Sequence, residues 1–255
     1  MPNWCENRLK VLGPASDVAR LREKARAVEE QVDDEGRLRQ LVSVLSLQEL
    51  YPCPAPLLDT AAGPDSRAVE VVFGSWTRHV PVGNTTINTR QELIDFIEEN
   101  NKGFTAYAHR CKKNIDEHGH PTWYTWKISH WGTKWDLCNP QEIGHSTETS
   151  KELSYIHEGK EAQADVEYSF ETAWAPPSSA FEKISKDFPT LVFELDFYEP
   201  GMEFGGSTRF EAGESEGGSE ELGELPAGSW ARERWEDDKR AWAEEEALYE
   251  AEREE

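Results

Sequence analysis

Alternating apolar and polar residues mark three stretches of the chain as strands with one buried side: residues 3–12, 163–174 and 191–198. The side chains expected to face the core are Cys5, Asn7, Leu9, Val11, Ala164, Val166, Tyr168, Phe170, Thr172, Leu191, Phe193, Leu195 and Phe197. A two-residue period is typical of a sheet with one covered face. The three stretches therefore predict the strands around which the chain folds.

Apolar residues spaced three and four apart predict helices that cover this sheet. The first is expected to begin at Ser16, a favourable N-cap, and to end near Gln31. Another is expected within residues 176–189. With a second strand placed within residues 38–50, the order is strand–helix–strand, an insertion at about residues 57–134, then strand–helix–strand. This order predicts an α+β fold, a split βαβ antiparallel sheet with helices on one face.

Residues 123–136, WYTWKISHWGTKWD, hold four of the ten tryptophans of the chain. Pro121 stands at a first helical position and Gly132 at a stop position, so a short helix is predicted up to about Trp131. The end of this stretch is expected to lead into a strand at 135–143. The predicted insertion is therefore helical and carries an aromatic cluster.

The C-terminal region has a different composition. Residues 211–228 are rich in Gly, Glu and Ser and are predicted to be a disordered linker. Residues 229–255 are predicted to form an acidic helix, on which one aromatic residue recurs every seven positions: Trp235, Trp242 and Tyr249. One aromatic per two turns is too narrow a stripe for a core-facing helix. We expect either a helix that docks in a partner's groove or a solvated helix whose aromatics rest on its own body.

The charge of the chain limits the classes of partner. The net charge is -23, with 50 acidic and 27 basic residues, and residues 211–255 alone hold 17 acidic and 5 basic residues. The outer face of the predicted sheet is expected to show Glu167, Glu171, Glu194 and Asp196. Such a field repels phosphate backbones, so nucleic-acid binding is disfavoured. It suits a protein partner with a basic surface, or it serves only solubility.

The cysteines and the hydropathy indicate a compartment. The four cysteines are scattered, with no CxxC pair: Cys5, Cys53, Cys111 and Cys138. No apolar stretch is long enough for a signal peptide or a membrane span. We therefore expect a soluble cytoplasmic protein with reduced cysteines and no membrane partner.

Five segments occur in this order along the chain: MPNWCENRLKVLG, LYPCP, HWGTKWD, FETAWAPP and FYEPGMEFGG. Together they resemble the YubB-type ferredoxin-like family, small proteins carried by phages, prophages and plasmids. The resemblance covers roughly residues 1–210 and leaves the acidic tail outside. It implies a ferredoxin-like domain over 1–210 and a mobile-element origin, and it implies no activity.

A binding site is predicted where the tryptophans and polar residues lie at element boundaries: Trp131, Lys134, Trp135, Asp136, Thr172, Trp174 and Glu199. Tryptophan offers a large apolar area and one N–H donor, which suits a shallow aromatic site. The alternative is that these tryptophans form a packed core where the insertion meets the sheet.

Metal and catalytic sites receive less support. The residues His109, Cys111, His118 and His120 could surround zinc, but their spacing matches no common zinc motif. Carboxylates at predicted strand ends, Asp136, Glu171 and Glu199, could perform acid–base chemistry. The sequence has no Ser-His-Asp order, no P-loop and no dinucleotide-binding glycine motif. We therefore predict no catalytic residues, no metal and no cofactor.

These observations favour an accessory protein that acts by protein–protein interaction. Its most specific form is counter-defence, or imitation of nucleic acid towards a nuclease. The alternative is a small enzyme or ligand-binding protein that uses an aromatic pocket around Trp131–Asp136.

Overall fold

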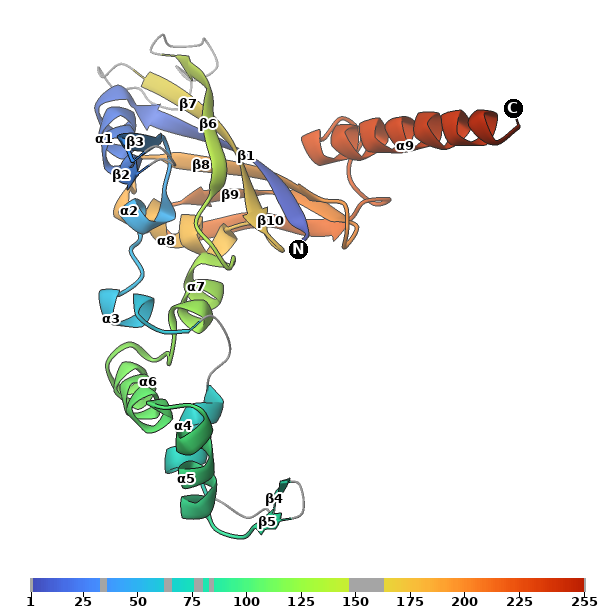
Figure 1. Ribbon diagram of the computed structural model, residues 1–255. Coiled ribbons are helices and arrows are strands. Elements are labelled where there is room, and N and C mark those ends of the chain that lie inside the picture. The colour runs from blue at the N-terminus through green and yellow to red at the C-terminus, as the bar shows by residue number, and fades with distance from the viewer. Residues whose placement is uncertain are drawn as a thin grey trace. The chain divides into compact units, whose positions relative to one another are not determined.

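The computed structural model describes residues 2–32, 36–61, 66–75, 80–82, 85–146 and 163–254 (Figure 1). The chain divides into two compact units. One consists of Met1–Pro52 together with Trp131–Glu255, and the other is Cys53–His130. The sequence predicts an insertion at about residues 57–134, and the second unit spans Cys53–His130.

The first unit is built on a six-stranded antiparallel sheet. Its strands are β1 (Trp4–Pro14), β6 (Cys138–Ser146), β7 (Gln163–Ala173), β8 (Val192–Glu199), β9 (Phe204–Glu211) and β10 (Glu214–Glu221). They lie in the order β10-β9-β8-β1-β7-β6. In β1, Leu9 is paired with Tyr168 on one side and with Leu195 on the other. All three side chains are buried, so the alternating stretches of the sequence meet in one core.

The connections confirm the predicted fold class. Helix α1 (Ala15–Ala25) follows β1, and helix α8 (Ser178–Asp187) joins β7 to β8. The four strands of this arrangement are, in chain order, β1, β6, β7 and β8. Across the sheet they lie in the order β8-β1-β7-β6, and each neighbouring pair is antiparallel. This is the ferredoxin-like split βαβ arrangement.

Both helices cover the same face of the sheet. Helix α8 buries Phe181, whose ring centroid lies 6.4 Å from that of Phe170, 6.1 Å from Phe193 and 6.4 Å from Phe210. Helix α1 buries Val18, Leu21 and Ala25. The opposite face carries polar residues such as Arg8 on β1 and Glu167 on β7, which form an ion pair.

The second strand of the fold is not where the sequence predicted it. Helix α1 ends at Ala25, not near Gln31, and β2 (Ala27–Val32) and β3 (Leu38–Ser43) form a separate two-stranded sheet. Strand β6 holds the second-strand position instead. Val28 and Val32 misled the prediction because a spacing of four is even, and so fits one face of a strand as well as one face of a helix. Both side chains are exposed, at 52% and 66%.

The predicted disordered linker is also corrected. Residues 214–221 form β10, which pairs with β9 along its whole length although every side chain on it is exposed. An edge strand is held by backbone hydrogen bonds, which need no apolar side chains. The helix expected from residue 229 is α9 (Trp230–Glu254), and the Ser229 hydroxyl oxygen accepts the N–H of Arg232 at 3.3 Å.

The remaining elements are mostly helical. Helix α2 (Leu47–Leu50) belongs to the first unit. The second unit contains α3 (Ala55–Leu58), α4 (Ser66–Phe73), β4 (Val80–Val82), β5 (Thr85–Ile87), α5 (Arg90–Asn100), α6 (Phe104–His118) and α7 (Trp123–Trp131), whose last residue is assigned to the first unit. Thr89 and Glu92 form a capping box at the start of α5. No helix in the described ranges combines the length and apolar character needed to cross a membrane.

Candidate functional site

Trp131 lies in the core of the first unit. Its side chain has no exposed surface, and its indole N–H donates a hydrogen bond to the carbonyl oxygen of Tyr51 at 2.9 Å. Gly132, with a φ of 84°, then turns the chain away from α7. Nearby, the buried Thr133 hydroxyl donates to the carbonyl oxygen of Ala173 at 3.0 Å. For Trp131, the packed-core alternative describes the structure.

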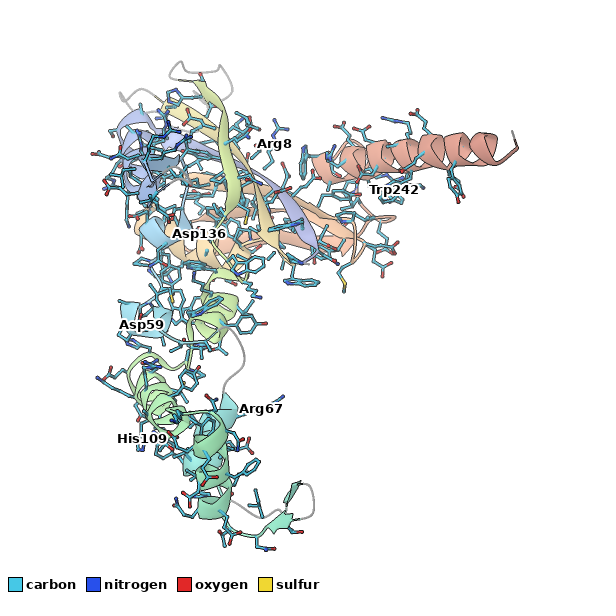
Figure 2. All side chains as sticks on the ribbon, in the orientation of Figure 1. Arg8, Asp59, Arg67, His109, Asp136 and Trp242 are labelled. Atoms are coloured by element: carbon cyan, nitrogen blue, oxygen red, sulfur yellow. The ribbon has the colours of Figure 1, made fainter. Side chains whose placement is uncertain are left out.

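Asp136 caps helix α2 (Figure 2). One carboxylate oxygen accepts the N–H groups of Leu47 at 2.7 Å and Leu137 at 2.8 Å. The other accepts the hydroxyl of Ser46 at 2.7 Å and the N–H of Gln48 at 3.2 Å. Four donors occupy the two oxygens of this carboxylate. Its role in the structure is therefore to stabilise the start of α2 and the segment around Leu137, and not to bind a ligand.

We predict that Asp136→Ala lowers the free energy of unfolding by about 3 kcal/mol, because several backbone donors lose a charged acceptor at once. Chemical denaturation followed by circular dichroism measures the change. The matched control is Asp187→Ala. Asp187 is exposed and forms a surface ion pair with Lys183 one turn away at 2.9 Å, so its removal should cost about 0.5 kcal/mol or less. Equal losses in the two variants would contradict the capping role.

Thr172 and Glu199 belong to a buried polar cluster at one end of the sheet. The Thr172 hydroxyl oxygen accepts the amide of Asn7 at 2.9 Å, and the same hydroxyl donates to the carbonyl oxygen of Ala175 at 2.8 Å. Glu199 has no exposed surface, and one of its oxygens accepts the N–H of Met202. Burial, reinforced by the charge of Glu199, raises the pKa of the neighbouring Cys5 thiol to about 12. Cys5 is therefore protonated at neutral pH and is a poor nucleophile.

Lys134, Trp135 and Trp174 lie at or near the surface together with Trp4. The Trp4 and Trp135 ring centroids are 6.1 Å apart, and the Lys134 ammonium lies 4.6 Å from the centre of the Trp135 ring, a cation–π distance. Trp174 has a φ of 74°, and its backbone N–H donates a hydrogen bond to the backbone carbonyl oxygen of Asn3 at 2.9 Å. The seven predicted site residues are thus divided among a core position, a helix cap, a buried polar cluster and an aromatic surface.

The histidines that were considered as zinc ligands do not gather around one point. His109 lies edge-on to Phe73, with ring centroids 4.8 Å apart, while His120 meets His130 at 5.0 Å. Cys111 is buried within α6. Within the described parts of the chain, no group of three or more histidine, cysteine, aspartate or glutamate side chains could hold a metal ion.

The outer face of the sheet carries both signs of charge. Arg8 forms an ion pair with Glu167. Arg209 pairs with Glu194 at 3.1 Å and with Glu211 at 3.0 Å. Two of the carboxylates expected on this face, Glu167 and Glu194, are therefore partly neutralised. The alternation of single strands could not indicate this, because each of these two pairs joins different strands.

Helix α9 docks on this outer face through its first half. Ala231 is buried against Tyr198, Leu222 and Leu225, and Trp235 packs against this cluster. Two polar contacts fix the same half of the helix. Both oxygens of Glu6 accept guanidinium N–H groups of Arg234 at 3.0 Å, and the Tyr198 hydroxyl donates to Asp238 at 2.9 Å.

In the second half of α9, every side chain that the structure describes is exposed. Trp242 is 53% exposed and Tyr249 is 61% exposed, and Figure 2 shows Trp242 on this part of the helix. The three aromatics that were predicted to act as one stripe are therefore divided. Trp235 serves the docking of the helix on its own body, and Trp242 and Tyr249 face solvent.

Residues 154–252 match the family model described as a ferredoxin-like domain in Api92-like protein. The crystal structure of protein api92 from Yersinia pseudotuberculosis is similar to 89% of this chain over 100% of its own length, with 11% identity and a TM-score of 0.38. No curated protein matches the chain.

The Api92-like match runs from before β7 to near the end of α9. The tail that the earlier resemblance left outside is therefore part of the matched segment. The residues that dock this tail were not among the predicted site residues: Tyr198, Leu222, Leu225, Ala231 and Arg234. Two leucines three positions apart within an otherwise polar tail were the available signal.

Proposed function

We propose that the protein is an interaction factor that presents the second half of α9 to a basic protein partner. The observation that carries this proposal is the pair Trp242 and Tyr249, seven residues apart on one helix face, both more than half exposed while the first half of the same helix is docked. Large aromatic side chains that protrude from a rigid helix are the usual anchors of a helix-in-groove interface.

The charge around these anchors specifies the partner. Residues 241–255 contain seven acidic residues and one basic residue, and Glu244, Glu245 and Glu246 are exposed between the two aromatics. A complementary surface has an apolar slot bordered by lysine and arginine. Such a groove resembles a nucleic-acid site, so imitation of nucleic acid towards a nuclease is the specific form of the proposal. The resemblance to YubB-type proteins supports a mobile-element accessory role, such as counter-defence, in the cytoplasm.

We predict that Trp242→Ala combined with Tyr249→Ala weakens partner binding at least about 100-fold, because truncation of two anchor residues removes most of the contact energy. The measurement begins with affinity capture from bacterial lysate by the full chain. Titration with the purified captured protein follows. Binding should also weaken as salt rises. The control is Phe96→Ala, since Phe96 is also exposed, at 40%, but lies in the other unit.

The variant should leave the fold intact, since exposed substitutions change stability by about 0.5 kcal/mol or less. A partner that binds the double variant as tightly as the original chain would place the interface elsewhere. A partner whose binding is insensitive to salt would contradict the basic groove.

A further inference from the structure

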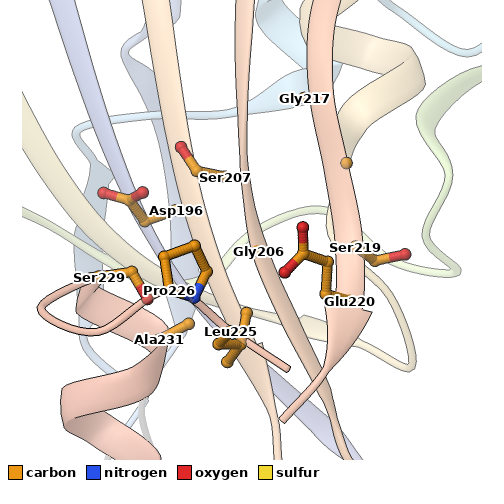
Figure 3. A pocket seen from close by; sticks show the side chains of 11 residues that line it. Asp196, Gly206, Ser207, Gly217, Ser219, Glu220, Leu225, Pro226, Ser229 and Ala231 are labelled. Carbon is orange, nitrogen blue, oxygen red and sulfur yellow. The ribbon is translucent and has the colours of Figure 1, made fainter. Parts of the chain in front are cut away.

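A cavity of about 380 Å³ lies against the outer face of β8, β9 and β10, beside the segment that leads into α9 (Figure 3). It is lined by Asp196, Gly206, Ser207, Gly217, Gly218, Ser219, Glu220, Leu225, Pro226, Ser229 and Ala231. Its volume falls in the lower part of the range of small-molecule sites, about 300–1,000 Å³. All of these residues belong to the first unit.

Glycines create the space. Gly218 is paired with Ser207 across β9 and β10, and a Cβ atom at Gly218 would meet no atom within 4 Å. At Gly205, in contrast, a Cβ atom would lie 2.9 Å from the Cβ of Ala231 and 3.2 Å from Leu225. The start of α9 therefore covers the strands at Gly205 and leaves the space at Gly218 unfilled.

The charged side chains that line the cavity, Asp196 and Glu220, are both acidic. Figure 3 shows the carboxylates of Asp196 and Glu220 on two sides of the space. Among the residues that the structure describes, no lysine, arginine or histidine lines it. Burial raises the pKa of Asp196, while its hydrogen bond to Ser207 and the charge of Arg8 act in the opposite direction. Arg8 is itself engaged in an ion pair with Glu167. The Asp196 carboxylate is therefore partly removed from water and would gain from a cation placed beside it.

The remaining wall is apolar. Leu225, Pro226 and Ala231 line the side formed by the tail (Figure 3). The N-terminus of α9 also lies here, but it contributes only about half a positive charge, and the Ser229 hydroxyl already accepts one of its N–H groups. The two carboxylates outweigh it.

We propose that this cavity binds a small alkylammonium ion, with the ammonium group beside Asp196 and Glu220 and the alkyl chain against Leu225, Pro226 and Ala231. The inference is independent of the partner surface on the second half of α9, because no residue of that half lines the cavity. An ammonium group supplies the missing charge, and a short alkyl chain covers the apolar wall.

The test is a titration of the ¹⁵N-labelled full chain with n-butylammonium chloride, followed by amide chemical shifts. We expect saturable shifts at residues 217–220 and at Ser229. Two controls use 1-butanol, which has the same alkyl chain without the charge, and sodium chloride at equal ionic strength. Neither should reproduce the shifts. Equal saturation by 1-butanol, or no saturable shift with the amine, would overturn the proposal.

Three variants test whether the ion binds in this cavity. Gly218→Val fills the space at a strand position that tolerates a β-branched residue, so amine binding should be lost. Gly223→Val adds the same atoms where a Cβ atom meets nothing within 4 Å and outside the lining residues, so binding should persist. Asp196→Asn should weaken binding at least about tenfold. Amine binding that is unchanged in Gly218→Val would refute the placement of the ion in this cavity. Unshifted amide signals of β1 and β7 verify that each variant is folded.

Discussion

Trp131→Ala should lower the free energy of unfolding by about 3–5 kcal/mol, the usual cost of truncating a large buried aromatic to alanine. Trp131 has no exposed surface, so the substitution leaves a cavity that its neighbours fill only in part. It also removes the hydrogen bond that the indole N–H donates to the Tyr51 carbonyl oxygen. For a chain of this size the unfolding midpoint should fall by about 10 °C.

Thermal and urea denaturation of the original protein and of the Trp131→Ala variant, followed by far-ultraviolet circular dichroism, measures this loss of unfolding free energy. Trp131→Phe is an informative companion, because it keeps a six-membered aromatic ring and loses the N–H group together with the rest of the five-membered ring. We expect it to cost about half as much as alanine. Trp242→Ala is the control, since Trp242 is 53% exposed and should change stability by about 0.5 kcal/mol or less. A loss below about 1 kcal/mol for Trp131→Ala would restore the interpretation of this residue as part of an open pocket.

The central strands of the sheet could be predicted from the sequence because their two faces differ. In β1, β7 and β8, one face packs under helices and the other carries polar residues, so the two-residue period is unambiguous. The split βαβ order then follows from the helices between these strands. The central sheet therefore needs no information beyond local patterns.

The edges of the sheet could not be predicted in the same way. Strand β6 has register shifts against β7, contains Pro140, and has a φ of 51° at Asn139, so its alternation is broken. Strand β10 has no buried side chain. Both lie at edges of the sheet, where pairing depends on the backbone of one neighbour and not on side-chain pattern.

The candidate site depends on contacts between residues far apart in sequence. Asp136 accepts hydrogen bonds from Ser46, 90 residues earlier, and from the backbone of the two residues that follow Ser46. A carboxylate that caps a helix and one that binds a ligand look the same in a sequence. Only the surrounding donors distinguish them, which is why the predicted pocket resolved into separate structural roles.

The second large effect is expected from Gly205→Val, which should release the first half of α9 from the sheet. A Cβ atom at Gly205 would lie 2.9 Å from the Cβ of Ala231 and 3.1 Å from the carbonyl oxygen of Phe197. Real Cβ atoms do not approach other carbons so closely, and valine adds two further carbons. The sheet is held on both sides of β9, so the helix is the element that must move.

Release of α9 from the sheet should break all of its docking contacts together. The ion pair of Arg234 with Glu6 and the hydrogen bond of Tyr198 to Asp238 both depend on the position of Ala231. Backbone amides in residues 222–238 should therefore exchange with deuterium at least about 100-fold faster, as a local opening becomes the dominant state. Amides of β1 and β7 should keep their protection, because α8 and α1 cover the other face. Hydrogen-exchange mass spectrometry resolves these segments.

Gly223→Val supplies the matched control for this substitution, since a Cβ atom there meets nothing within 4 Å. Unchanged exchange in residues 222–238 of the Gly205→Val protein would mean that the helix does not rest on β9, and the division of α9 into a docked and an open half would fail. Faster exchange confined to that segment would show that one glycine holds the helix in place. The same variant should then lose amine binding, because Ala231 and Leu225 form part of the cavity wall, while Trp242 and Tyr249 remain available to a partner.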